Sequence, residues 1–106
     1  MPKFMLKASY TPEGIKGLLR EGGTSRRSTI EELARSLGGS IEAFYYALGE
    51  DDVYVISDFP DNVTAVAVSG AVNASGAVKL TTVPLVTAEE VDQAAQKAVD
   101  YRPPGA

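Results

Sequence analysis

The segment Phe44–Ile56, FYYALGEDDVYVI, places two runs of β-forming residues on either side of a short polar turn. Aromatic and β-branched residues fill both runs, and Gly49 begins the turn. This pattern predicts a β-hairpin. Its first strand covers residues 40–48, its turn residues 49–52 and its second strand residues 52–59.

The rest of the chain continues as alternating strands and helices. Period-two alternation predicts strands, and apolar residues three and four apart predict helices. A capping box of Thr87 and Glu90 predicts the start of the last helix. Around the hairpin, the predicted elements are a strand over 3–10, a helical turn or two within 15–21, a helix over 24–37, a helix over 61–76, a strand over 77–86 and a helix over 87–100.

The order β-α-β-β-α-β-α predicts an α+β fold, a ferredoxin-like βαββαβ domain with a C-terminal helix, covering residues 1–106 as one domain. Right-handed crossovers place both main helices on one face of a four-stranded antiparallel sheet. The other face stays open, and an open face of this size is normally covered by another subunit. We therefore expect two chains to pair through their sheets into a dimeric α/β barrel.

Alternation along the strands sorts their side chains into two faces, provided that the register is unbroken. One set is almost wholly apolar and is expected to lie beneath the helices. The other set mixes aromatic and charged residues, and two interpretations of it stay open: a pocket for a small organic molecule, with or without weak cofactor-independent chemistry, or a partly wet subunit interface. The candidate ligand-binding residues of this mixed face are Lys7, Phe44, Tyr46, Tyr54 and Asp58.

Composition excludes several kinds of site. The chain has no Cys, His or Trp, which removes disulfides, thiolate zinc sites and the commonest general base and metal ligand. A net charge of −4 argues against nucleic-acid binding. No apolar run reaches about 18 residues, so we expect no membrane span, and without a signal-peptide core we expect a cytoplasmic location. We expect no cofactor, and no residue is named as catalytic.

Three consecutive carboxylates, Glu50, Asp51 and Asp52, lie at the tip of the predicted hairpin. Oxygen ligands suit Ca²⁺ or Mg²⁺, but three neighbours in a turn point in different directions, and the spacing of a known calcium loop is absent. We therefore predict a solvated tip and no metal site.

Arg26 and Arg27 follow the residues GGTS at the start of a predicted helix. Free backbone amides and the helix dipole favour anions at such a position, which makes the two arginines weak candidates for anion binding. The alternative is a capped helix whose arginines face solvent and pair with neighbouring acids.

Several segments together resemble the GYD-domain family, small bacterial proteins named for a Gly-Tyr-Asp signature. The resemblance spans nearly the full chain and implies a ferredoxin-like, dimeric α/β-barrel architecture, while it implies little about function. Gly49 and Asp52 match the signature glycine and aspartate, whereas Asp51 stands where the tyrosine is expected. The segments that carry the resemblance are YTPEGIKGLL, GG.SRR, SLGG.IEAFYYALG, DVYVI, ASGAV, TTVPL and DYRPPG.

The C-terminal segment DYRPPG, residues 100–105, is stiffened by two prolines. We expect Tyr101 and Arg102 to dock on the body of the protein or on a partner subunit. The partners expected are therefore further copies of the chain, as a homodimer or higher homo-oligomer, and a small organic ligand. Two main functions remain open at this point, a ligand-binding barrel and a non-catalytic assembly module, and a metal-binding site on the acidic tip is the third and least favoured hypothesis.

Overall fold

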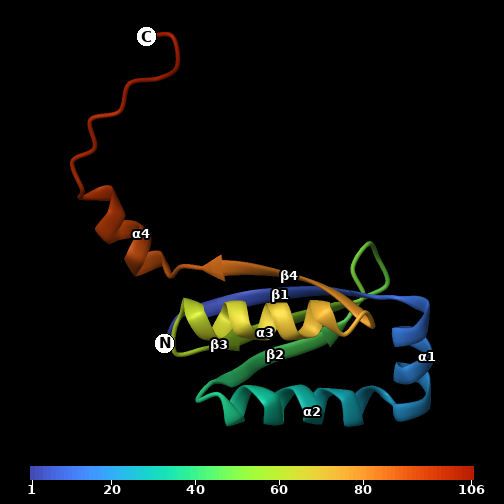
Figure 1. Cartoon of the computed structure of the whole chain (residues 1–106). Helices are drawn as coiled ribbons and strands as arrows, with labels where there is room; N and C mark the ends of the chain where they lie inside the picture. Colours follow the sequence, from blue (N-terminus) through green and yellow to red (C-terminus); the bar gives the residue numbers. More distant parts are fainter.

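A computed structural model describes residues 1–106 and contains four strands and four helices (Figure 1). Their order confirms the predicted α+β class and the hairpin at its centre. None of the helices is long and apolar enough to cross a membrane. The elements are β1 (Lys3–Tyr10), α1 (Pro12–Glu21), α2 (Gly23–Ser36), β2 (Ser40–Tyr46), β3 (Val53–Asp58), α3 (Asn62–Ala74), β4 (Val78–Leu85) and α4 (Ala88–Ala95).

The four strands form one antiparallel sheet in the order β2-β3-β1-β4, which is compatible with a ferredoxin-like fold. Helix α2 packs on the edge strand β2, and α3 packs on the other edge strand, β4. Both helices lie on the same face of the sheet, and no element of the chain covers the other face (Figure 1).

Local capping explains where the helices begin. Thr11 caps α1 by accepting a hydrogen bond from the Gly14 amide, and Asp61 caps α3 in the same way. The predicted capping box at the start of α4 is present. Helix α2 begins one or two residues before the predicted cap, directly after Gly22, whose φ of 91° is readily adopted only by glycine.

The hydrophobic core lies between the sheet and the helices and is thin. Only 11 of the 106 residues are buried, and ten of these form one cluster. Phe4 and Phe59 anchor one end of it, with their ring centroids 5.9 Å apart. Because α2 and α3 lie over the two edge strands, neither helix fully covers the central strands β1 and β3.

A β-bulge in β2 corrects part of the predicted face assignment. Ile41 pairs with Ser57, but the next pair joins Ala43 to Ile56, which leaves Glu42 as an extra residue. Because side chains alternate with a period of two, one inserted residue moves every later side chain of the strand to the opposite face. The side chains affected are those of Ala43, Phe44, Tyr45 and Tyr46.

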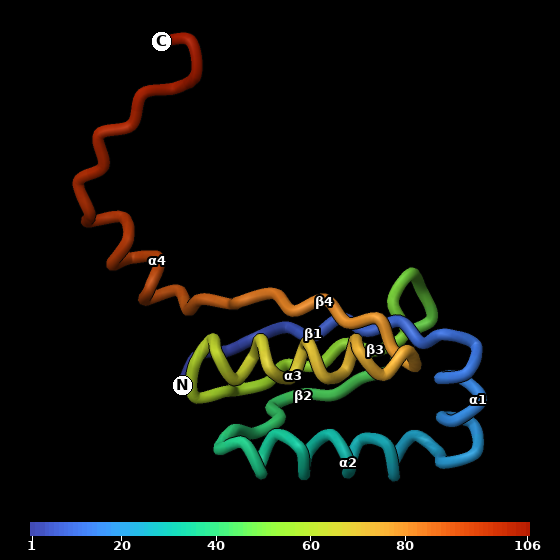
Figure 2. The backbone as a smooth tube through the Cα atoms, viewed as in Figure 1, coloured from blue at the N-terminus to red at the C-terminus, as the bar shows by residue number.

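Residues 86–106 project from the body of the molecule (Figure 2). Every side chain in this tail is exposed, and α4 does not pack on the sheet or on the other helices. The radius of gyration is 16.9 Å, compared with about 13 Å for a compact chain of this length. The expected docking of Tyr101 and Arg102 on the body of their own chain is therefore wrong, and docking on a partner subunit stays a prediction.

Candidate functional site

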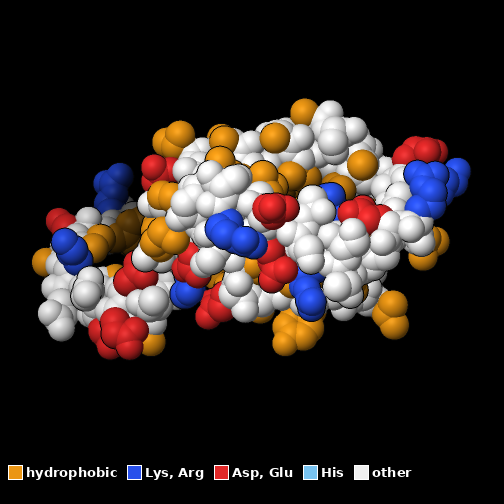
Figure 3. Space-filling view, turned by 90° about the horizontal axis from the view of Figure 1, so that it is seen from below, with side chains coloured by type: hydrophobic (Ala, Val, Ile, Leu, Met, Phe, Trp, Pro, Cys, Tyr) orange, Lys and Arg blue, Asp and Glu red, His pale blue; other side chains and the backbone are white.

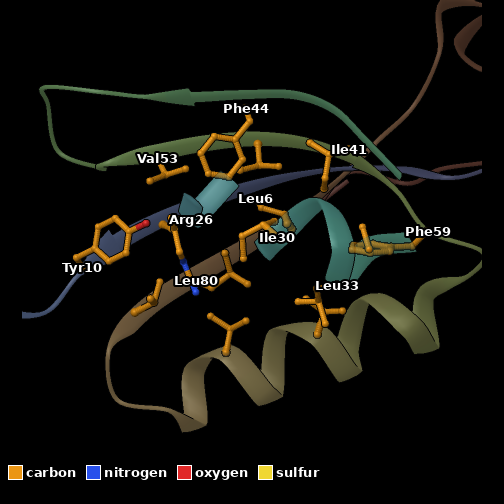
Figure 4. Close-up of a pocket in the computed structure, with 16 residues that line it drawn as sticks. Leu6, Tyr10, Arg26, Ile30, Leu33, Ile41, Phe44, Val53, Phe59 and Leu80 are labelled. Carbon is orange, nitrogen blue, oxygen red and sulfur yellow. The ribbon is translucent and has the colours of Figure 1, made fainter. Parts of the chain in front are cut away.

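A cavity lies between α2 and α3 above the central strands of the sheet (Figure 4). Its volume is about 60 Å³. Leu6 of β1 and Val55 of β3 form part of its floor, Ile30 and Leu33 of α2 one wall, and Val72 of α3 the opposite wall. The cavity follows from the placement of the helices, since each packs mainly on an edge strand and the two make few contacts with each other.

Arg26 is the only charged residue among the sixteen that line this cavity. It lies in the first turn of α2, is half-buried and forms no salt bridge, whereas the next residue, Arg27, is exposed and lies 4.0 Å from Glu31. The Tyr10 hydroxyl is turned toward Arg26 (Figure 4). Burial raises the pKa of Tyr10, and the neighbouring guanidinium opposes that shift in part. Arg26 and Tyr10 thus give the cavity one polar end.

Tyr46 supports this end of the cavity from outside. Its hydroxyl donates a hydrogen bond of 3.0 Å to the carbonyl oxygen of Gly23, the first residue of α2. Its ring packs edge-on against Phe44, which lines the cavity, with centroids 5.3 Å apart. Partial burial raises the pKa of Tyr46, the direction that favours the protonated, donating form of its hydroxyl. The end of β2 and the start of α2 are therefore joined next to Arg26.

A second hollow, of about 320 Å³, lies at one end of the open sheet face and has no hydrophobic lining. Lys7 and Lys79 contribute ammonium groups to it, and neither forms a salt bridge. Asp51 accepts hydrogen bonds from the Ser9 hydroxyl at 3.1 Å and from the Tyr54 hydroxyl at 3.4 Å. The hollow is polar and open, in contrast to the apolar cavity under the helices.

The family model for the GYD domain matches residues 4–95. The chain belongs to the GYD-domain family. The match confirms the resemblance drawn from the sequence segments, over the whole sheet and all four helices. No curated protein and no solved structure matches the chain.

The signature residues of this GYD-domain chain join the hairpin to β1. Asp52 accepts a hydrogen bond of 2.8 Å from the backbone amide of Tyr10, and Asp51, in the place of the signature tyrosine, binds Ser9 and Tyr54. Glu50 is exposed, as expected for a solvated tip, whereas Asp51 is half-buried and hydrogen-bonded, which corrects the prediction for this residue, and half-buried Asp52 bonds an amide of β1. No group of three or more His, Cys, Asp or Glu residues is arranged to hold a metal ion.

The five residues predicted to line one ligand pocket lie on both faces of the sheet in this GYD-domain protein. Lys7, Tyr54 and Asp58 lie on the open face as predicted. Asp58 is held 2.9 Å from Lys3, at the opposite end from the polar hollow. The predicted positions of Phe44 and Tyr46 are wrong, because the bulge at Glu42 turns both toward the helices.

Arg26, predicted from the helix start as a weak anion ligand, lies at the polar end of the apolar cavity, and Arg27 does not line it. Tyr10 was not among the residues predicted from the sequence to form a site. A signal for it exists, since Tyr10 follows Phe4, Leu6 and Ala8 at period two and places a hydroxyl at the end of an apolar strand face.

Proposed function

We propose that this GYD-domain protein binds a small, mostly apolar organic molecule in the cavity between α2 and α3. The lining of that cavity carries the proposal, since every residue around it except Arg26 is hydrophobic. Ligand sites combine apolar walls with a few converging polar groups, and Arg26 and Tyr10 supply such groups at one end. The class of ligand is the one expected from the sequence, but the site lies on the helix side of the sheet.

The packing around the cavity favours an occupant. Protein interiors are normally close-packed, and an empty cavity costs stability in proportion to its volume. Here α2 and α3 do not close over the central strands, and Leu33 on α2, which lines the cavity, remains 38% exposed. Hydrophobic side chains are visible among charged ones when the molecule is viewed from the side of α2 (Figure 3). An apolar ligand restores the missing contacts.

The volume of the cavity limits the size of the ligand. A water-sized group needs roughly 10–15 Å³ of such space, so 60 Å³ holds about four to six groups. An engineered cavity that accepts benzene has roughly 150 Å³. A slender chain therefore fits the cavity as it stands, and a ring requires α2 and α3 to move apart.

Titration with short apolar molecules, followed by the backbone amide signals in NMR, tests the proposal. We expect saturable shifts at residues that line the cavity, and loss of these shifts in Val72→Phe, whose ring fills the space. Val63→Phe is the matched control, because Val63 lies on the same helix and is exposed. Absence of saturable binding to the native chain, or full binding to the folded Val72→Phe variant, contradicts the proposal.

We also propose that two chains pair through the open sheet face into a dimeric α/β barrel, which supports an assembly role for this face. An apolar row of Ala43, Ile56, Met5 and Val83 crosses all four strands of the sheet. The chain exposes 7341 Å², about 1,600 Å² more than a compact protein of its mass. The projecting tail of residues 86–106 contributes to this excess, so the pairing rests on the apolar row across the sheet and not on the total exposed area.

The mass of the particle in solution tests the pairing. We expect a dimer or larger homo-oligomer for the native chain, and a monomer for Met5→Lys, which places a charge in the centre of the apolar row. Leu19→Lys is the control, because it charges an exposed leucine on α1, away from the sheet. A native chain that is monomeric at high concentration contradicts the pairing and leaves the ligand cavity unaffected.

A further inference from the structure

Given the proposed binding function, on which this inference rests, we infer that the ligand of the cavity is a slender organic carboxylate. Its apolar chain lies between α2 and α3, and its carboxylate is held at the polar end by the Arg26 guanidinium with the Tyr10 hydroxyl beside it. The proposed binding function is thereby extended by the chemical class of the ligand and by the end of it that lies beside Arg26.

The state of Arg26 calls for an anion. Its guanidinium is half-buried against an apolar lining and forms no salt bridge. A partly desolvated cation is costly unless it is paired, and the planar fork of arginine matches both oxygens of a carboxylate. Glu21 lines the same crevice beside α1 as Arg26 but accepts a hydrogen bond from Ser25, and the Asp52 carboxylate accepts one from the backbone amide of Tyr10. Arg26 is left without a carboxylate partner of its own.

The polar end of the cavity is also the end through which a charged group reaches water. Arg26, Tyr10 and Val78 line both the cavity and the neighbouring crevice beside α1. The Tyr10 hydroxyl faces the Arg26 guanidinium and its own proton has no acceptor within the chain, in contrast to the Tyr46 hydroxyl, which donates to Gly23. The Tyr10 hydroxyl and the Arg26 guanidinium, which forms no salt bridge, therefore lie together where the apolar cavity meets solvent.

The start of α2 adds to the positive potential at this end. Arg26 lies in the first turn of this helix, which has no acidic residue in that turn and no side-chain cap at its N-terminus. Within the chain, the carboxylate of Glu21, which accepts a hydrogen bond from Ser25, lies beside this helix start, but no carboxylate lies in the first turn itself. A carboxylate beside Arg26 is favoured by the partial positive charge of the helix dipole, whereas a cationic ligand is opposed by it.

Two six-carbon probes test the apolar cavity and the carboxylate position beside Arg26 separately. Hexanoate and hexan-1-ol each carry a slender alkyl chain of the length that the cavity accepts, and only hexanoate is charged. We expect hexanoate to bind the native chain about ten-fold or more tightly than the alcohol, in NMR titrations at constant ionic strength. Arg26→Met should remove this preference and leave the affinity for the alcohol within about two-fold.

Arg27→Met is the matched control, since it removes the neighbouring exposed charge and should leave both affinities unchanged. Arg26→Lys keeps the positive charge but lacks the planar guanidinium, so its preference for hexanoate over hexan-1-ol should be intermediate. This second variant tests the inference if Arg26→Met does not fold. Equal binding of acid and alcohol to the native chain, or an unchanged preference in the Arg26 variants, overturns the carboxylate and leaves the cavity as a binding site. Failure of both probes to bind the native chain overturns the proposed function and the inference with it.

Discussion

The Tyr46 hydroxyl donates a hydrogen bond of 3.0 Å to the carbonyl oxygen of Gly23, and this bond joins the last residue of β2 to the first residue of α2. The contact is close, because a Cβ atom added to Gly23 would lie 3.0 Å from the Tyr46 ring. Gly23 lies three residues before Arg26 in the sequence, and Tyr46 contacts the start of the same helix. The position of α2 over the sheet, and with it the polar end of the cavity, depends on this pair.

Tyr46→Phe should therefore lower the free energy of unfolding by about 0.5–1 kcal/mol, the lower part of the range for one hydrogen bond, because the side chain is 42% exposed. Chemical denaturation measures the change. Tyr45→Phe is the control, since the Tyr45 side chain is 71% exposed, lies on the opposite face of the sheet and makes no hydrogen bond. Equal stability of Tyr46→Phe and the native chain would show that water replaces the bond without loss.

Two glycines in α1 should respond to alanine with opposite signs. A Cβ on Gly14 would overlap the carbonyl oxygen of Ala77, which already accepts hydrogen bonds from Thr11, so Gly14→Ala should cost about 1–3 kcal/mol. Gly17 has no atom within 4 Å of such a Cβ, and Gly17→Ala should gain about 0.5–1 kcal/mol of helix stability. Thermal or chemical unfolding of both variants checks the signs, and two effects of the same sign contradict the prediction.

Asp52 should contribute more to stability than its neighbour Glu50, although both lie in the acidic turn. Asp52→Ala leaves the half-buried amide of Tyr10 without its acceptor at 2.8 Å, and we expect a loss of about 1–2 kcal/mol in chemical denaturation. Glu50→Ala removes an exposed side chain that makes no hydrogen bond and should change the stability by less than about 0.5 kcal/mol. Similar losses of stability in both variants would contradict this prediction and show that Asp52 contributes no more than the solvent-exposed Glu50.

The parts of the fold that the sequence predicted correctly depend on local interactions. The caps of α3 and α4 join side chains to amides three residues away, so Asp61, Thr87 and Glu90 are sufficient to predict them. The bulge in β2 is different. On either register the strand presents aromatic residues to the helices, Tyr45 in one and Phe44 in the other, and only pairing with β3 decides between them.

The candidate site was predictable in its residue types but not in its place. Arg26, Phe44 and Tyr46 were selected for their charge or aromatic rings, and all three lie in or beside the cavity. The cavity itself arises because α2 and α3 pack mainly over edge strands and make few contacts with each other, an arrangement that no local pattern encodes. Strand alternation therefore selected Phe44 and Tyr46 but assigned both to the wrong face, and the other three residues that it selected, Lys7, Tyr54 and Asp58, lie on the open face away from the cavity.

The cap of α3 gives the chain a pH dependence at its acidic limit. The Asp61 carboxylate accepts hydrogen bonds from the backbone amide of Thr64 at 2.8 Å and from its hydroxyl at 2.7 Å, and these bonds lower the pKa of Asp61 below its ordinary value of 3.8. A carboxyl group whose pKa is lower in the folded state stabilises the fold above its unfolded pKa. That contribution is lost as the pH falls through the folded value.

Asp61→Ala should therefore be less stable than the native chain near neutral pH, and the difference should shrink as the pH falls below about 4. Denaturant titrations from about pH 7 to about pH 2.5 measure the two curves. Asp61→Asn keeps a neutral oxygen at the cap, so its deficit should be smaller than that of Asp61→Ala at each pH and should shrink by a similar amount on acidification, because neither variant titrates at this position. A deficit of Asp61→Ala that is as large at the acidic end as at neutral pH would mean that the charge of Asp61 does not contribute, and that the cap acts through its geometry alone.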